Sequence, residues 1–157
     1  MSQSGETNHR TTLTREEGYR FRVRFDHEGM PDLITDEAPP IGEGKGPTPS
    51  RLLATAVANC LAASLLFCLG KARIEVEGLE AEVVTEFARN EAGRLRIGGM
   101  RVRLSPRWDA ETAAKAQRCL GIFESFCVVT ESVRHGVPVS VEVDGVPPAS
   151  EGAGGAR

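Results

Sequence analysis

The stretch at residues 49–71, PSRLLATAVANCLAASLLFCLGK, decides the fold because no charged side chain stands between Arg51 and Lys71. A run of this length lies at the lower edge of the ~17–25 residues that cross a bilayer as a helix. Small and polar residues interrupt it, however, and neither Trp nor Tyr stands at its ends to mark a membrane interface. We therefore predict no membrane span but the central helix of a soluble protein, apolar on every side because other elements pack around it.

The chain of 157 residues has the length of one domain that can form a hydrophobic core without a metal or disulfide. Its net charge of -3 argues against binding to nucleic acid or to an anionic membrane surface. The N-terminus is polar and lacks the apolar segment of a secretory signal, so we expect a cytoplasmic protein with four reduced cysteines. No CxxC pair and no Cys/His cluster occurs, so no metal site is expected.

Residues 18–26, GYRFRVRFD, alternate aromatic residues and valine with arginine, which predicts a strand with one buried face. The side chains of Arg20, Arg22 and Arg24 share its other face. That face is either a solvated surface or the source of one cation for an anionic site. A short strand is expected at 33–35, followed by a loop rich in Pro and Gly that leads to the long helix.

The period-2 pattern returns over residues 78–104 and predicts a β-hairpin with its turn at 90–93. The alternation slips by one residue at Gly98 and Gly99, which predicts a β-bulge there. No Gly-rich phosphate loop with the required spacing follows any predicted strand, so nucleotide binding is not indicated.

Two helices and a last strand complete the predicted elements. Asp109 is a good N-cap for the first helix, and a second helix at 126–135 would be capped by Ser125 and ended by Gly136. Four valines alternate within 137–145 and predict the strand. This order of strands and helices predicts an α+β fold rather than a wound parallel sheet.

The chain is expected to hold one folded domain between two mobile ends. Residues 1–17 are predicted to be a flexible segment, residues 18–146 the domain, and residues 147–157 a disordered tail rich in Gly and Ala.

The four cysteines admit only certain pairs. Cys60 and Cys68 lie eight residues apart on one helix, so roughly 12 Å separates them, beyond the ~7 Å limit for a disulfide. A local redox couple must therefore join one of them to Cys119 or Cys127, and the place of Cys127 near a helix N-terminus favours its thiolate. Free cysteine is also a common core residue, and we predict that role for Cys68 and Cys119.

Two motifs resemble the signatures of the OsmC/Ohr family: GPTPSRLLATAVANCLAASL at residues 46–65 and CVVTESVRHGVPVSVEV at residues 127–143. The resemblance follows the order of elements over nearly the whole chain. It implies an OsmC-like fold in an intertwined homodimer. Curved, mainly antiparallel sheets would surround long buried central helices, with the active sites at the dimer interface.

The resemblance also implies roles for two thiols in an oxidative stress response. Cys60 matches the peroxidatic cysteine, whose thiolate attacks the O–O bond of an organic hydroperoxide and becomes a sulfenic acid. Cys127 matches the resolving cysteine, which condenses with that acid to a disulfide. An external dithiol, such as the lipoyl group of a lipoylated protein, then reduces the disulfide. No bound cofactor is implied.

The chain departs from the peroxidase signatures at positions that carry charge. Where the family places a glutamate after the first motif's proline, this chain has Ser50 and Arg51, and Pro40 stands where one branch has an arginine. Arg51 and Arg22 are therefore our candidates for stabilising the Cys60 thiolate. The alternative is a dimer that binds a small molecule or senses redox state and has lost the Glu/Arg pair.

Overall fold

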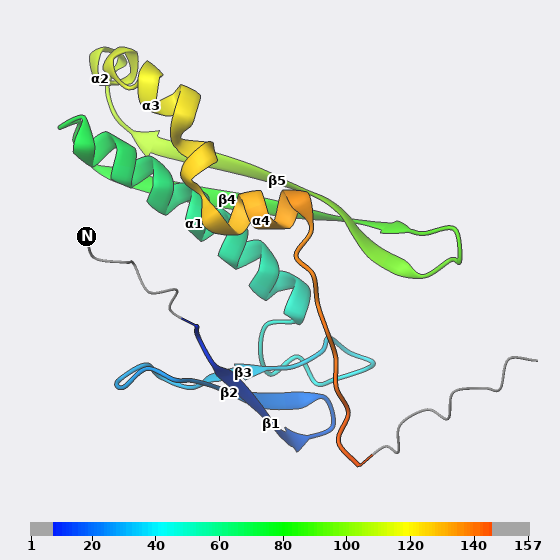
Figure 1. Ribbon diagram of the computed structural model, residues 1–157. Coiled ribbons are helices and arrows are strands. Elements are labelled where there is room, and N and C mark those ends of the chain that lie inside the picture. The colour runs from blue at the N-terminus through cyan, green and yellow to red at the C-terminus, as the bar shows by residue number, and fades with distance from the viewer. Residues whose placement is uncertain (1–7, 146–157) are drawn as a thin grey trace, which may run out of the picture.

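The computed structural model describes residues 8–145, which form two parts joined through the start of one long helix (Figure 1). A three-stranded sheet lies apart from a two-stranded hairpin, and the long helix packs along the hairpin beside the short helices. The elements in chain order are β1 (Thr11–Glu17), β2 (Arg20–Phe25), β3 (Leu33–Thr35), α1 (Pro49–Lys71), β4 (Gly78–Arg89), β5 (Leu95–Arg107), α2 (Ala110–Lys115), α3 (Gln117–Ile122), the 3-10 turn η1 (Phe123–Phe126) and α4 (Val128–His135).

The N-terminal sheet has the order β1-β2-β3 and is antiparallel throughout. Its formation corrects one expectation, because Thr11–Glu17 form a strand where a flexible segment was predicted up to residue 17. The tight turn at Gly18, with φ of 51°, lets β1 fold back on β2. The backbone of β2 then supplies the hydrogen-bond partners of β1, whose polar sequence has no strand pattern. Val23 is the one residue of β2 that is fully buried.

Helix α1 starts at Pro49, whose fixed φ suits a first turn, and ends at Lys71 before Arg73 takes a positive φ of 57°. Only one stripe of it is buried within the chain, while Leu66 and Phe67 are exposed, so the expectation of a helix covered on every side is wrong for one chain. The buried stripe consists of Ala54, Val57, Ala58, Leu61, Leu65 and Leu69.

Helix α1 is also the one helix among residues 8–145 that is long and apolar enough to cross a membrane. This is weak evidence for a span, because the core helix of a soluble protein meets the same criteria of length and composition. The buried stripe against the hairpin and the short helices accounts for its apolar sequence in part.

The hairpin of β4 and β5 confirms the predicted turn and bulge. Each strand pairs with the other along its length, and the register shifts opposite Gly98, between the pairs that Glu86 and Phe87 make. A Cβ at Gly98 would lie 2.9 Å from the Cβ of Ala88, closer than two such carbons pack. The bulge therefore needs glycine for a close approach rather than for a special backbone angle.

The helical segment after the hairpin is more broken than its sequence predicted. Asp109 caps α2 as expected, accepting a hydrogen bond from the Thr112 N–H at 2.8 Å. The predicted single helix is interrupted at Ala116, which is fully buried. Cys127 rather than Ser125 is the N-cap residue of α4, and the expected end of that helix at Gly136, with φ of 76°, is confirmed.

The last predicted strand is absent from the single chain. Residues 137–145 carry no strand, and the side chains of Val137, Val139, Val141 and Val143 are all exposed. A strand needs a neighbour for its backbone hydrogen bonds, and within residues 8–145 no strand pairs with this segment. The expectation of a strand at 137–145 is therefore wrong for one chain, while the domain end predicted at residue 146 and the tail predicted at 147–157 lie outside the described residues.

The core consists of two adjoining clusters along α1. The first holds Leu65, Leu69, Ala116 and Cys119. The second holds Val57, Leu61 and Cys127. Two partly buried side chains, Leu104 and Phe123, pack against both clusters and so join them.

Cys68 of α1 and Cys119 of α3 form a disulfide, with 5.6 Å between their Cα atoms. The expectation that all four cysteines are thiols is therefore wrong, as is the view of Cys68 and Cys119 as plain core residues. Cys119 does lie in the first core cluster as expected. The pairing depends on how α3 docks against α1, a contact between segments 51 residues apart that local sequence patterns do not determine.

Candidate functional site

Cys60 and Cys127 lie together, one from the middle of α1 and the other from the N-terminus of α4. The Cys60 side chain packs against the core cluster that holds Cys127. Cys127 is 1% exposed and Cys60 is half-buried, so Cys60 is the more accessible sulfur. Both are free thiols, which gives the chain one reduced pair beside its disulfide.

Thr130 fixes the position of Cys127 and was not identified from the sequence. The Cys127 thiol donates to Thr130 Oγ1 at 3.0 Å, and that hydroxyl donates onward to the Val57 carbonyl of α1 at 3.5 Å. Thr130 is buried, so this short chain of hydrogen bonds spans α4 and α1 without competing water. The only signal in the sequence was the position of a hydroxyl three residues after the capping cysteine.

The two thiols are not equivalent in acidity. Burial raises the pKa of Cys60, and its hydrogen bond to Cys127 raises it further, against opposing hydrogen bonds from the Val129 and Thr130 backbone. Burial also raises the pKa of Cys127, but hydrogen bonds from Cys60, Thr130 and Ser64 outweigh it and hold this pKa below the usual thiol value. The surroundings therefore favour a thiolate at Cys127 more than one at Cys60.

A mainly apolar cavity of about 630 Å³, partly open to solvent, lies next to residues that contact Cys127, although neither cysteine lines it. The ion pair of Arg134 and Glu124 adds charge to its wall. Val57, Leu61 and Thr130, which contact Cys127, form part of its wall, and β5 closes another side with residues such as Met100. The cavity is large enough for a small organic molecule, and its lining favours an apolar one. No group of three or more His, Cys, Asp or Glu side chains within residues 8–145 is arranged to hold a metal ion.

A comparison with family models identifies the family. A family model described as OsmC-like protein matches residues 42–142, which include both free cysteines. The chain belongs to the OsmC-like family. The predicted α+β, OsmC-like fold is thereby confirmed. A search of the curated proteins finds no match.

Solved structures share the fold of this OsmC-like protein at low sequence identity. The organic hydroperoxide resistance protein OhrB of Bacillus subtilis is 22% identical, with 82% of this chain and 91% of that chain covered at a TM-score of 0.59. The organic hydroperoxide resistance protein OsmC of Legionella pneumophila is 14% identical, with 83% and 92% covered at 0.65. A putative osmotic stress induced and detoxification response protein of Psychrobacter arcticus is 21% identical, with 84% and 91% covered at 0.62.

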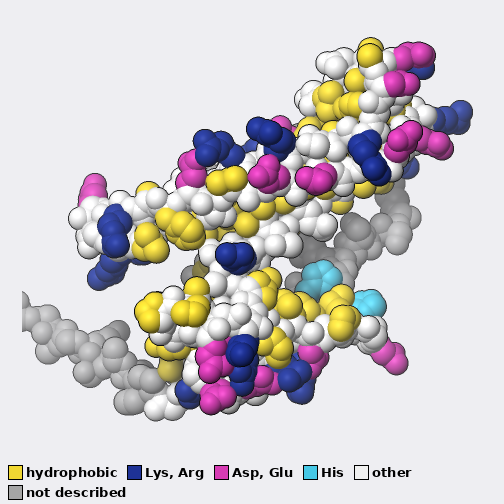
Figure 2. Space-filling view, turned by 180° about the vertical axis from the view of Figure 1, so that it is seen from behind, with side chains coloured by type: hydrophobic (Ala, Val, Ile, Leu, Met, Phe, Trp, Pro, Cys, Tyr) yellow, Lys and Arg dark blue, Asp and Glu magenta, His cyan; other side chains and the backbone are white. Residues whose placement is uncertain are grey.

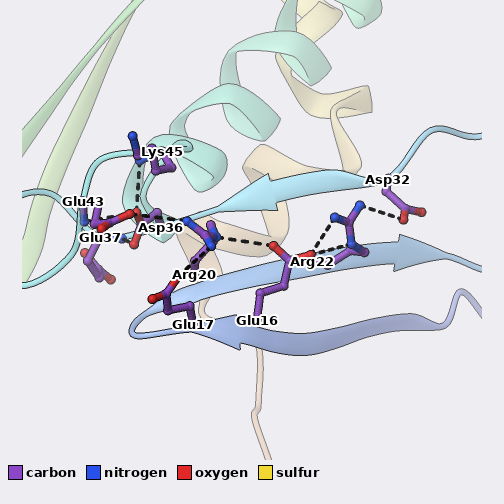
Figure 3. A network of polar contacts seen from close by, with 9 residues as sticks. All are labelled: Glu16, Glu17, Arg20, Arg22, Asp32, Asp36, Glu37, Glu43 and Lys45. Carbon is purple, nitrogen blue, oxygen red and sulfur yellow. Dashed lines mark hydrogen bonds and ion pairs between the residues drawn. The ribbon is translucent and has the colours of Figure 1, made fainter.

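Neither arginine proposed for the OsmC-like site reaches the thiols within the chain. Arg51 is exposed in the first turn of α1, nine residues and therefore about 13 Å along the axis before Cys60. Arg22 on β2 pairs with Glu16 at 2.6 Å and with Asp32 at 3.4 Å (Figure 3). The structure thus brings the two cysteines together but leaves both candidate cations elsewhere.

Asp36 organises the loop before α1 and was also not identified from the sequence. Its buried carboxylate accepts backbone hydrogen bonds from Glu37, Glu43 and Lys45 at 2.8, 3.1 and 3.0 Å (Figure 3). The hydrogen bond from Lys45 and those from the other two residues hold the pKa of Asp36 below its usual value. The carboxylate thus replaces regular secondary structure in fixing the loop that positions the start of α1.

Proposed function

We propose that this OsmC-like protein reduces organic hydroperoxides through the Cys60/Cys127 pair. The observation that carries the proposal is the contact of two free thiols from separate elements beside an apolar cavity. Relatives of the same fold bear the name organic hydroperoxide resistance protein, which supports this substrate class.

The proposed reaction uses the more accessible Cys60 as the nucleophile. Its thiolate attacks one peroxide oxygen, the O–O bond breaks, and the alcohol leaves after taking up a proton, so that Cys60 becomes a sulfenic acid. The Cys127 thiolate then attacks the Cys60 sulfur, the disulfide forms as the S–O bond breaks, and the hydroxide that leaves takes up a proton to become water. The lowered pKa of Cys127 favours this second step, whereas the raised pKa of Cys60 slows the first.

An external dithiol completes the proposed cycle. It reduces the Cys60–Cys127 disulfide by thiol–disulfide exchange and becomes a disulfide itself. A lipoyl group, free or on a lipoylated protein of the cytoplasm, is the proposed dithiol. No bound cofactor is needed, since each electron pair passes between sulfur and oxygen or between two sulfurs.

We also propose that the working form is a homodimer. The chain exposes 13051 Å², whereas a compact monomer of 16.9 kDa exposes about 7,700 Å². Even fully extended, the undescribed ends add about 3,000 Å² at most, so surplus surface remains. The two parts also turn hydrophobic side chains toward the hollow between them (Figure 2). A second copy would cover this surface and give the valines of 137–145 a strand to pair with.

A second candidate function is favoured by the lack, in the described part of the chain, of a neighbouring positive charge for a Cys60 thiolate. Arg51 is exposed and Arg22 is paired to carboxylates, and among residues 8–145 the main influences on the Cys60 pKa are burial, Cys127 and backbone groups, not a side-chain cation. A dimer with such a site would bind a small apolar molecule or sense redox state without rapid turnover of peroxide.

The deciding experiment follows consumption of cumene hydroperoxide with dihydrolipoamide. We expect turnover by the wild type and by Asn59→Ser, which adds a serine to the same helix, and none by Cys60→Ser. Cys127→Ser should accumulate a sulfenic acid at Cys60 that a dimedone probe labels. Unchanged turnover by Cys60→Ser would refute the peroxidase, and failure of stoichiometric peroxide to remove two thiols per chain would favour the second candidate.

A further inference from the structure

The Cys68–Cys119 disulfide lies in surroundings unlike those of the free pair. Leu65, Leu69 and Ala116, all nearly or fully buried, enclose it in the first core cluster. No hydroxyl or backbone donor of the kind that surrounds Cys127 contacts these sulfurs in the described part of the chain. Cys119 is buried while Cys68 is half-buried, so the bond lies nearer to solvent on its Cys68 side.

The two sulfur pairs are also separate in space. Cys68 follows Cys60 on α1 by eight residues, which is about 12 Å along the helix axis. Direct exchange between the pairs would require α1 to unfold, so each pair has its own redox state. The folded chain therefore holds one bonded and one free cysteine pair that cannot exchange with each other.

The disulfide nevertheless contacts the proposed site indirectly. It ties α3 to α1, and α3 continues directly into η1, whose first residue is Phe123. Phe123 and Leu104 pack against both core clusters, and both side chains also line the cavity beside the free pair. Holding α3 on α1 thus holds one wall of that cavity.

We propose that Cys68–Cys119 is a second, independent thiol–disulfide couple, a clamp that fixes α3 and η1 on α1 and thereby sets the shape of the cavity beside Cys60 and Cys127. It is a modification site for external dithiols and disulfides. The couple itself does not depend on the proposed peroxidase, although its effect on substrate binding rests on that proposed function.

Opening the clamp is a balanced exchange with a dithiol. A dithiol thiolate attacks the half-buried Cys68 sulfur, the bond to Cys119 breaks, and the Cys119 sulfur leaves as a thiolate that takes up a proton. The second thiol of the reagent then displaces Cys68, which is protonated in turn. The cystine gains two electrons and two protons, and the dithiol becomes a cyclic disulfide. A small-molecule disulfide reverses the reaction.

The couple is tested in Cys60→Ser/Cys127→Ser, which keeps only the second pair and has no peroxidase chemistry. We expect no thiol to react with Ellman's reagent in denaturant before reduction, and two per chain after dithiothreitol in denaturant. Peptide mapping should recover residues 68 and 119 in one linked peptide. If the protein is first incubated with oxidised dithiothreitol and still shows two reactive thiols per chain without any reduction, the proposal is overturned.

The clamp is tested by thermal unfolding and by the emission of Trp108, the single tryptophan, which packs on the first core cluster. For a closed loop of this size, reduction should lower the Tm of Cys60→Ser/Cys127→Ser by about 8–16 °C and change the Trp108 emission. Cys68→Ser/Cys119→Ser, the matched control, should show neither change on reduction. An unchanged Tm in the first variant would refute the clamp.

The effect on the cavity is measured separately with two substrates. If the peroxidase is active, Cys68→Ser/Cys119→Ser should raise the KM for cumene hydroperoxide several-fold and leave that for hydrogen peroxide unchanged, because only the bulky substrate fills the cavity. Equal KM values in wild type and variant would overturn the link between clamp and cavity. Absence of peroxidase activity in the wild type itself would refute the proposed function and not the couple, which the thiol counts decide.

Discussion

Replacing Thr130 by valine should raise the pKa of Cys127 while keeping the shape of the side chain. In the thiol form Thr130 Oγ1 accepts from Cys127 at 3.0 Å and donates to the Val57 carbonyl at 3.5 Å, and in the thiolate form the hydroxyl turns to donate to the sulfur instead. A hydrogen bond to a charged group contributes about 1.5–3 kcal/mol. Because each 1.36 kcal/mol is a factor of ten, Thr130→Val should reduce the thiolate population of Cys127 about 10- to 150-fold below its pKa.

The assay is the rate of alkylation of Cys127 by iodoacetamide in a Cys60→Ser background, measured between pH 6 and 10. The pKa of Cys127 lies below the usual thiol value, so its thiolate is present above that pKa and is lost as pH falls through it. In Thr130→Val the rise in rate should move to higher pH, and Thr130→Ser, which keeps the hydroxyl, should restore the original profile. Identical pH profiles for Thr130→Val and its parent would refute the role of this hydroxyl.

Three further results follow from the site, the loop and the proposed interface. In Cys127→Ser, sulfenic acid formation at Cys60 should rise about tenfold per pH unit between pH 6 and 8, because its raised pKa leaves little thiolate there; a flat dimedone-labelling rate would contradict this. Asp36→Asn should lower the Tm at pH 7, and its difference from wild type should shrink as pH falls below about 4, where the unfolded carboxyl is protonated. Val139→Asp and Val141→Asp should each change the sedimentation coefficient from that of a dimer to that of a monomer. The two side chains are 82% and 79% exposed in one chain, so an unchanged sedimentation coefficient would mean that they lie in no interface.

Local signals account for the parts of the fold that the sequence predicted well. The long helix was predicted in the stretch that forms α1 because proline marks its start and its uncharged run is continuous. The bulge at Gly98 could be predicted from the sequence because a one-residue slip in the alternation reverses which face of the strand is apolar. Each of these features depends on residues close together in the chain.

Long-range contacts account for the parts that it did not predict. The strand Thr11–Glu17 has no apolar alternation and exists because β2 pairs with it. The bond between Cys68 and Cys119 depends on where α3 docks. The valines of 137–145 have the pattern of a strand but no partner in one chain, which shows that periodicity reports a preference and not the presence of a neighbour.

At the candidate site, the sequence indicated which thiols meet but not what surrounds them. A sulfur anion in an apolar site needs either a nearby cation or several oriented dipoles. This chain uses dipoles: the hydroxyls of Thr130 and Ser64 act on Cys127, together with the Thr130 backbone at the start of α4. They stabilise the charge at Cys127 rather than at Cys60, since Cys60 faces the same sulfur as a hydrogen-bond partner. If the pair works as proposed, these surroundings favour the Cys127 thiolate that closes the disulfide over the Cys60 thiolate that attacks the peroxide.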